Sequence, residues 1–263
     1  MVNYMTSKPR IGILIPRSNL GALFSDHSLA ELRTIGDCRF NETDGHLDES
    51  GAVEVLRDAD IAIGSWGTVR PTGPLLEACP RLRMWEHVAG SVKAFFGPHM
   101  EGRDLVVASC APAIADSVAE MTVGELIFGL RRLIEKNRHL MGFEDLPDPD
   151  KVNLFSSTIG VIGASQVGRR VIKLLRAFDA EILLYDPFVE QEEAEGLGVT
   201  RMTDLVELFQ RSNAVTLHTP ALPETRNLVG ARHFAALPDH GVFVNTSRGT
   251  CVDEPAMVEA WVN

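Results

Sequence analysis

At 263 residues the chain is long enough for two modest domains, and its 45% hydrophobic and 23% charged content is ordinary for a soluble globular protein. A net charge of −11 without a basic run argues against partners such as nucleic acid or a membrane surface. The N-terminus lacks the apolar core of a signal peptide, and no stretch has the roughly 18 apolar residues of a membrane-spanning helix. The four cysteines show no metal-binding spacing and favour free thiols in a reducing compartment. We therefore expect a cytoplasmic protein without a metal site.

Between residues 10 and 110, short apolar runs alternate with helical patterns. The runs predict strands at Ile11–Ile15, Ile61–Ile63, Leu82–Trp85 and Leu105–Ala108. The helical patterns lie near Ser28–Thr34, Val53–Arg57 and Pro74–Cys79. This alternation predicts parallel strands joined by helical crossovers, and therefore a small α/β domain.

A long helix is predicted to begin at Ser117, because Ser117 and Glu120 have the spacing of a capping box. An apolar stripe continues from there to the basic segment 136–139. Further apolar residues lie outside the stripe, at Met121, Phe128 and Leu133. They leave two alternatives open: a plain core helix, or a helix buried against a second domain or subunit.

The acidic, proline-containing segment Gly142–Asn153 predicts a loop or hinge. The alternation then resumes. Beyond a first βαβ unit, strands are expected at Val199–Met202, Ala214–His218 and Gly241–Asn245. Helices are expected at Asp204–Gln210, Ala231–Leu237 and Glu254–Val262.

The segment Thr158–Asp186 carries the most information. An apolar run, a glycine turn, a helical pattern and a second apolar run make a βαβ unit with a dinucleotide-binding fingerprint. In this fingerprint Gly163 allows the tight turn, Gly168 lets the helix pack closely, and the helix start faces the pyrophosphate. Ser165 stands where the second glycine is usual.

Asp186 lies 18 residues after Gly168 (186 − 168), close to the spacing of a ribose-binding carboxylate. A carboxylate there accepts hydrogen bonds from ribose hydroxyls and repels a 2′-phosphate, which favours NAD over NADP. The alternative is an ordinary strand–turn–helix with an acid at a strand end.

Ligands of an open parallel sheet bind beyond the carboxyl ends of its strands. The predicted ends in this half are Ala164–Val167, Asp186–Pro187, His218–Pro220 and Thr246–Gly249. Arg248 is placed to bind a carboxylate through two hydrogen bonds and to polarise a neighbouring carbonyl.

The segments LHTPALPETRNLVG (217–230) and HGVFVNTSRGTCVDE (240–254) resemble the NAD domain of the D-isomer-specific 2-hydroxyacid dehydrogenases. The resemblance covers essentially the whole chain and is strongest from 116 to 254. It implies an α/β fold of two doubly wound domains: a flavodoxin-like substrate domain at 1–112 and an NAD-binding Rossmann domain at 113–263. Residues 116–140 would form a linking and dimerisation helix, so a homodimer is expected.

The resemblance also implies roles for single residues. Arg248 would be the catalytic arginine that orients a small 2-hydroxy or 2-oxo acid. The backbone of Ala89, Gly90, Ser91 and Val92 would hold the carboxylate of that substrate. NAD would contact Gly163, Ser165, Gln166, Val167, Gly168, Asp186, Pro187, His218, Thr219, Pro220, Thr225, Thr246, Ser247 and Arg248. His218 is expected to be a pocket wall and not an acid or base.

The sequence departs from the family's pattern after Arg248. The family's proton-transferring histidine and its partner glutamate lie well downstream of the arginine, and only 15 residues follow here (263 − 248). We therefore expect a Rossmann domain truncated before its last strand, with its fifth strand as an open edge, in an inactive fragment. Lys93 and Ile114 also stand where relatives often have aspartate and asparagine.

The alternative function is a non-catalytic NAD-sensing or partner-binding relative. Reading the gene past codon 263 for a downstream glutamate and Pro-His pair would separate the two functions. A different Rossmann enzyme, similar to homocysteine hydrolases, is disfavoured by the NTSRG segment.

Overall fold

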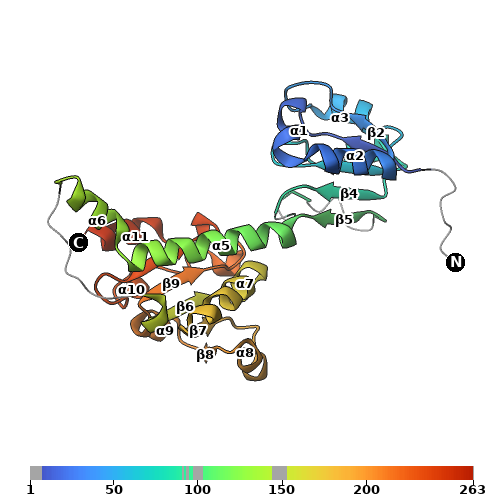
Figure 1. Cartoon of the computed structure of the whole chain (residues 1–263). Helices are drawn as coiled ribbons and strands as arrows, with labels where there is room; N and C mark the ends of the chain where they lie inside the picture. Colours follow the sequence, from blue (N-terminus) through green and yellow to red (C-terminus); the bar gives the residue numbers. More distant parts are fainter. Residues whose placement is uncertain (1–7, 91, 93–94, 97–102, 144–152, 263) are drawn as a thin grey trace. The chain divides into compact units, whose positions relative to one another are not determined.

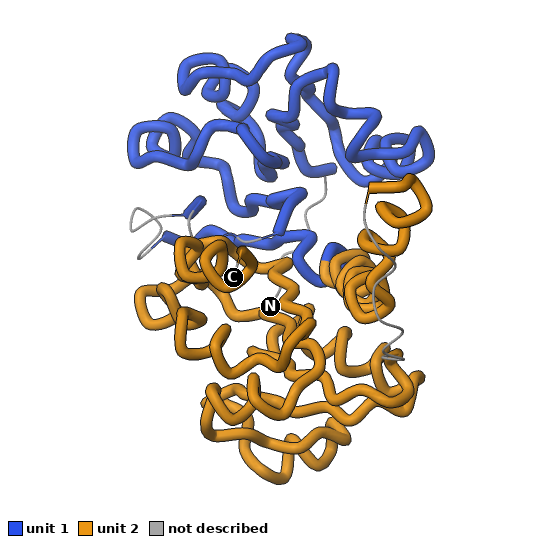
Figure 2. Tube along the Cα trace, turned by 90° about the vertical axis from the view of Figure 1, so that its left-hand side faces the viewer, with its two compact units in different colours: residues 1–114 blue, residues 115–263 orange. Residues whose placement is uncertain are grey.

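The computed structural model describes residues 8–90, 92, 95–96, 103–143 and 153–262. The chain divides into two compact units, Met1–Ile114 and Ala115–Asn263 (Figure 2). Each unit has its own parallel sheet with helices on both faces. In the described part of the chain no helix is long and apolar enough to cross a membrane.

Unit 1 is built on a five-stranded sheet in the order β2-β1-β3-β4-β5, which is the flavodoxin-like order. The strands are β1 (Arg10–Ile13), β2 (Asp37–Phe40), β3 (Ile61–Gly64), β4 (Met84–His87) and β5 (Val106–Ser109) (Figure 1). The helices are α1 (Arg17–Leu23), α2 (Asp26–Ile35), α3 (Glu49–Leu56) and α4 (Gly73–Ala78). Leu56 and Trp85 are fully buried on one face of the sheet, and Ile13 on the other, as a parallel sheet requires.

Two elements of unit 1 are absent from the sequence prediction. Strand β2 (DCRF) lies at the sheet edge with alternately exposed residues, so it has no apolar run for a pattern to detect. Helix α1 has seven residues, and its apolar residues Leu20 and Leu23 are only partly buried, so its apolar stripe is too short for a pattern to detect. The strand predicted at Leu82–Trp85 is shifted, because Leu82 lies in the turn before β4 and donates its N–H to the carbonyl of Cys79.

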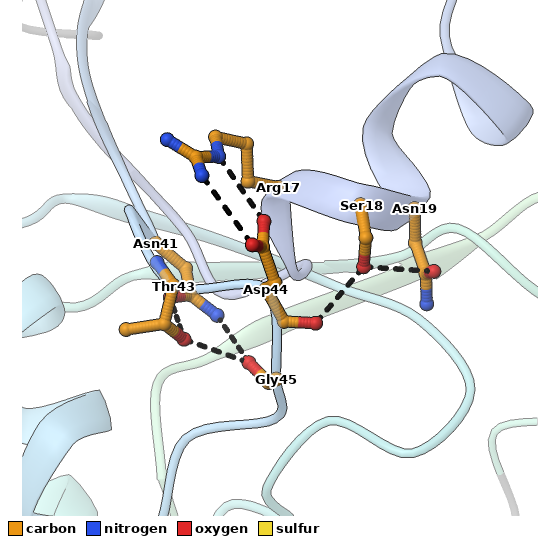
Figure 3. A network of polar contacts seen from close by, with 7 residues as sticks. All are labelled: Arg17, Ser18, Asn19, Asn41, Thr43, Asp44 and Gly45. Carbon is orange, nitrogen blue, oxygen red and sulfur yellow. Dashed lines mark hydrogen bonds and ion pairs between the residues drawn. The ribbon is translucent and has the colours of Figure 1, made fainter.

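Buried Asn41 organises the carboxyl edge of this sheet (Figure 3). Its Nδ2 donates to the carbonyls of Leu14 (3.3 Å) and Gly45 (3.0 Å), and its Oδ1 accepts from the backbone N–H of Thr43 (2.9 Å). The loops after β1 and β2 are thereby joined through a single amide. Exposed Asp44 adds an ion pair to Arg17 at 3.1 Å, which the solvent screens.

Unit 2 has the strand order β10-β9-β6-β7-β8, a Rossmann order in which β10 is an edge strand. Its strands are β6 (Thr158–Ile162), β7 (Glu181–Tyr185), β8 (Thr200–Met202), β9 (Ala214–Leu217) and β10 (Val242–Asn245). Its further helices are α6 (Leu133–Leu140), α7 (Gln166–Leu175), α8 (Gln191–Leu197), α9 (Leu205–Arg211), α10 (Ala231–Phe234) and α11 (Glu254–Val262). The strands and helices predicted after residue 153 all appear, most with ends within one or two residues of the prediction; α10 ends three residues early, at Phe234. In the predicted hinge, residues 144–152 lie outside the described part.

Helix α5 (Ala111–Leu130) corrects two expectations. It begins six residues before Ser117, so the capping box predicted there lies inside the helix; the proline in its first turn, Pro112, has no N–H that needs a partner. It ends at Leu130, and α6 starts separately after Arg132, whose φ is +49°. One side of α5 carries the buried residues Ala115, Ala119, Thr122, Val123, Leu126 and Leu130.

The other side of α5 is not covered by the described residues of unit 2. Met121 is 51% exposed and Phe128 is 46% exposed. The choice between the two alternatives for this helix therefore stays a prediction.

The Asn41 network yields a stability prediction. Asn41→Ala leaves the buried carbonyl of Leu14 without its partner, which costs about 1–3 kcal/mol, and it also removes the bonds to the more exposed Thr43 and Gly45. We expect the urea concentration at the midpoint of unfolding of unit 1 to fall clearly. The fluorescence of buried Trp85 is used to monitor this unfolding. The matched control is Arg17→Ala, which removes only the exposed ion pair and should leave the midpoint unchanged. If both variants lower the unfolding midpoint equally, the hydrogen bonds of Asn41 do not stabilise unit 1 more than the exposed ion pair does.

Candidate cofactor and substrate site

The turn between β6 and α7 requires glycine at two positions. Gly163 has φ +92°, and a Cβ added there would lie 3.0 Å from Cγ2 of Thr219. A Cβ added at Gly168 would lie 2.0 Å from the carbonyl oxygen of Gly163. The first glycine turns the chain and the second lets α7 approach the end of β6. The N-terminus of α7 is thus held directly at the carboxyl edge of the sheet.

Ser165, the departure from the usual fingerprint, is the N-cap of α7. Its φ of −63° is open to any residue, so replacement of glycine causes no backbone strain. Its Oγ accepts a hydrogen bond from the backbone N–H of Gly168 at 3.4 Å. Accepting this bond leaves the hydroxyl hydrogen able to donate to an anion. Gln166 is exposed and Val167 half-buried in the first turn that follows.

Asp186 follows β7 and joins two turns. Its Oδ2 accepts from the N–H of Ala164 at 2.7 Å, and its Oδ1 accepts from the N–H of Phe188 at 2.8 Å. The carbonyl of Ala164 in turn accepts from Nε of Arg169 at 2.8 Å. Two carboxylate oxygens offer about four acceptor positions, so the carboxylate can still accept ribose hydroxyls. Pro187 is exposed at the same turn.

The loop after β9 forms a second wall. His218 is 4% exposed, and its Nε2 lies 3.0 Å from Oγ1 of Thr216. Burial lowers the pKa of His218 to about 4, because the charged ring would lose its hydration. His218 is therefore neutral near pH 7, and its place as a pocket wall stays a prediction. Thr225 shapes the same loop, since its Oγ1 donates to the carbonyl of Pro220 (2.6 Å) and accepts from the N–H of Leu222 (2.9 Å).

Thr219 provides the test of whether this site fits a dinucleotide. Its Oγ1 is buried, faces no hydrogen-bond partner among the described residues, and belongs to the side chain that borders Gly163. An unpaired buried hydroxyl costs about 1–3 kcal/mol, so a polar ligand group that pairs with it would recover that loss. A glycine turn, a helix N-terminus, a ribose-competent carboxylate and this hydroxyl together fit the group.

The loop after β10 carries the predicted catalytic arginine. Oδ1 of Asn245 accepts from the N–H of Ser247 (2.9 Å), and its Nδ2 donates to the carbonyl of Arg248 (3.2 Å). The hydroxyl of Ser247 donates to the carbonyl of Thr219, which ties this loop to the previous one. Nη1 of exposed Arg248 donates to the carbonyl of Ser247 (2.9 Å), and the other guanidinium donors remain for a ligand.

Thr246 connects this loop to α5. Its Oγ1 lies 3.0 Å from Oγ1 of Thr122, whose hydroxyl donates to the carbonyl of Val118 at 2.8 Å. Sequence reasoning overlooked both Asn245 and Thr122. The asparagine beside the Thr-Ser-Arg-Gly run could have been found from its turn-forming chemistry, but Thr122 gives no local signal because it bonds across 124 residues.

All predicted cofactor contacts thus lie at the carboxyl ends of β6, β7, β9 and β10 in unit 2. The predicted substrate loop belongs to unit 1, where Ala89, Gly90 and Val92 follow β4. Ala89 is fully buried and its N–H donates to the carbonyl of His87 at 2.6 Å. Ser91 lies outside the described residues. Among those described, no three His, Cys, Asp or Glu side chains gather as metal ligands.

Comparison with known proteins finds a matching family and several related sequences. Residues 124–263 match the family model described as D-isomer specific 2-hydroxyacid dehydrogenase, NAD binding domain. D-3-phosphoglycerate dehydrogenase of Methanocaldococcus jannaschii is 30% identical over 215 residues, 81% of this chain and 41% of the relative. A 2-hydroxyacid dehydrogenase homolog of Haemophilus influenzae is 37% identical over 147 residues, 55% of this chain and 44% of the relative. The chain thus spans less than half the length of either relative.

A solved structure shares the fold. The NAD-complexed D-isomer specific 2-hydroxyacid dehydrogenase of Lactobacillus delbrueckii ssp. bulgaricus superimposes with a TM-score of 0.73 at 19% identity, covering 96% of this chain and 75% of that one. Together with the family match, this assigns the glycine turn and its flanking loops to a known kind of domain. The chain belongs to the D-isomer specific 2-hydroxyacid dehydrogenases, and residues 124–263 form their NAD binding domain.

Proposed function

We propose that the protein binds NAD at the carboxyl edge of unit 2 and uses it to interconvert a small 2-hydroxy acid and the corresponding 2-oxo acid. The observation that carries the proposal is the bond between the Asp186 carboxylate and the N–H of Ala164 at 2.7 Å, which joins the ribose acceptor to the pyrophosphate turn. When bound, the nicotinamide accepts or supplies a hydride at C2 of the substrate.

Each part of the edge has a task in this proposal. The N-terminus of α7, with Ser165 as its cap, holds the pyrophosphate through backbone N–H groups and the helix dipole. Asp186 accepts from the adenosine ribose and repels a 2′-phosphate, so NAD is preferred over NADP. The Thr219 hydroxyl and neutral His218 line the wall beside the turn.

Arg248 orients the substrate. Its planar guanidinium binds the substrate carboxylate through two parallel hydrogen bonds and polarises the 2-oxo group. Asn245 and Ser247 fix the backbone from which this side chain extends. For unit 1 we keep the proposal that the loop after β4, which begins with Ala89 and Gly90, binds a substrate carboxylate through its backbone.

His218 does not fit the role of a proton donor in this reaction, because burial keeps its ring neutral down to about pH 4. A non-catalytic NAD-sensing relative would share the cofactor half of the site and would differ by lacking substrate binding at Arg248.

The four free thiols support the proposed cytoplasmic location.

One prediction of the proposed function concerns the cofactor turn between β6 and α7. In Ser165→Gly, the NAD dissociation constant measured by calorimetry should stay within about threefold, because the N–H groups of the turn are unchanged, and the helix cap loses roughly a few tenths of a kcal/mol. Gly168→Ala should abolish binding, since a Cβ 2.0 Å from the Gly163 carbonyl forces α7 away from β6. Tight NAD binding by Gly168→Ala would overturn the proposed role of the turn.

The second prediction concerns the substrate. Oxamate, an unreactive isostere of a 2-oxo acid, should bind to the polypeptide in the presence of NADH, measured by the change in NADH fluorescence. Arg248→Ala should lose this binding, and Arg248→Lys should retain only part of it, because an ammonium lacks the paired donors.

Neither Arg248 variant should alter NAD affinity by more than a few-fold. If Arg248→Ala binds oxamate as tightly as the wild type does, the substrate proposal is refuted.

The third prediction concerns assembly. We propose a homodimer through the open side of α5, where Met121 and Phe128 are about half exposed. Light scattering after size exclusion should give twice the chain mass of 28.8 kDa. The double variant Met121→Glu/Phe128→Glu should elute as a monomer with its NAD affinity retained. A monomeric wild type at all concentrations would contradict the proposal.

A further inference from the structure

Thr122 is a buried polar residue in the middle of α5, and it contacts the loop that carries Arg248. Its side chain is fully buried, and its Oγ1 lies 3.0 Å from Oγ1 of the half-buried Thr246. The two residues are 124 positions apart in the sequence. A hydroxyl pair of this kind joins a helix to a loop that the chain reaches only much later.

The direction of this hydrogen bond follows from the chemistry of its partners. The Thr122 hydroxyl donates to the carbonyl of Val118 at 2.8 Å. A threonine hydroxyl has one hydrogen to donate, so the Thr122 oxygen can only accept a second bond. The donor is therefore the hydroxyl of Thr246, which is held towards α5. Without the Thr122 oxygen, this half-buried donor loses its partner.

Helix α5 is a fixed support beside β10. Leu126 of the helix and Val244 of the strand belong to the same hydrophobic core. Near the start of the strand, a Cβ added at Gly129 would lie 2.7 Å from Cγ1 of Val242, so helix and strand are in close contact there. Thr122 extends this contact past the end of β10 to the loop that follows.

The other side-chain bonds of this loop act in other directions. Asn245 closes the turn on itself, since it accepts from the N–H of Ser247 and donates to the carbonyl of Arg248. The hydroxyl of Ser247 donates to the carbonyl of Thr219 and so attaches the turn to the neighbouring loop along the sheet edge. The bond to Thr122 comes instead from the helix that packs on one face of the sheet. It therefore limits rotation of the turn about the contact along the edge.

We propose that Thr122 is a positioning residue for Arg248. The inference rests on the proposed use of Arg248 to bind a substrate carboxylate. Arg248 lies two residues after Thr246, and its long side chain converts a small tilt of the turn into a larger displacement of the guanidinium. Two parallel hydrogen bonds to a carboxylate need the guanidinium plane in place to within about 0.5 Å. Because Thr122 is fully buried, it acts through Thr246 and not by touching a ligand.

The test uses the full chain with NADH and oxamate. Thr122→Val keeps a side chain of similar shape and removes the hydroxyl. It should weaken oxamate binding roughly tenfold, as expected for one lost hydrogen bond, and leave the NADH dissociation constant within about twofold. Thr122→Ser keeps the hydroxyl and should bind oxamate as the wild type does. A purely structural role would lower both affinities together.

A second variant tests whether Thr122 acts through Thr246. Thr246→Val removes the donor of the same hydrogen bond. The double variant Thr122→Val/Thr246→Val should then bind oxamate no more weakly than Thr246→Val alone, because the single substitution has already broken the bond. Additive losses in the double variant would contradict this route.

The matched control is Ser212→Ala. Ser212 is buried in the same unit, and its hydroxyl donates to the carbonyl of Leu208, four residues earlier, at 2.7 Å. The Thr122 hydroxyl makes the same local bond to Val118. Ser212 lies between α9 and β9, at the amino ends of the strands and away from the Arg248 loop. Ser212→Ala should therefore keep both affinities.

The possible failures are distinguishable. If Thr122→Val binds oxamate as tightly as the wild type, or loses NADH and oxamate affinity equally, the positioning role is wrong while the proposed role of Arg248 stands. If the wild type binds NADH but no oxamate, the inference fails together with the proposed substrate site.

Discussion

The site of unit 2 depends on the close approach of α7 to the end of β6. Gly168 lies so near the Gly163 carbonyl that a Cβ would come within 2.0 Å of it. This approach holds the positive end of α7 at the sheet edge and turns a common strand–helix connection into an anion-binding corner. Every other group of the site is arranged relative to this corner.

Asp186 links that corner to the rest of the edge. By accepting the N–H groups of Ala164 and Phe188, its carboxylate fixes the pyrophosphate turn and the turn after β7 in one arrangement. The hydroxyl of Ser247 makes a comparable link between the loops after β9 and β10. These polar bonds thus join the loops in two pairs, β6 with β7 and β9 with β10, without any ligand. The buried His218 stays uncharged over the working pH range.

In unit 2 the proposed cofactor contacts and Arg248 all follow the carboxyl ends of β6, β7, β9 and β10. The open side of α5 is not covered by the described residues of unit 2. The hydrogen bond between Thr122 and Thr246 joins this helix to the loop that carries Arg248.

By itself the sequence determined the fingerprint, the alternation of strands and helices, and the family, because glycine turns and apolar runs are local properties. It also indicated Asp186 and Arg248 from their places after predicted strands. The tertiary structure decided what depends on distant partners: the apolar patterns of β2 and α1 are too short to predict these elements, and α5 begins before its apparent capping box. Likewise, the unpaired hydroxyl of Thr219 depends on the loops that the sheet order brings together. Such proximity is set by packing across the sheet, which a local pattern does not record.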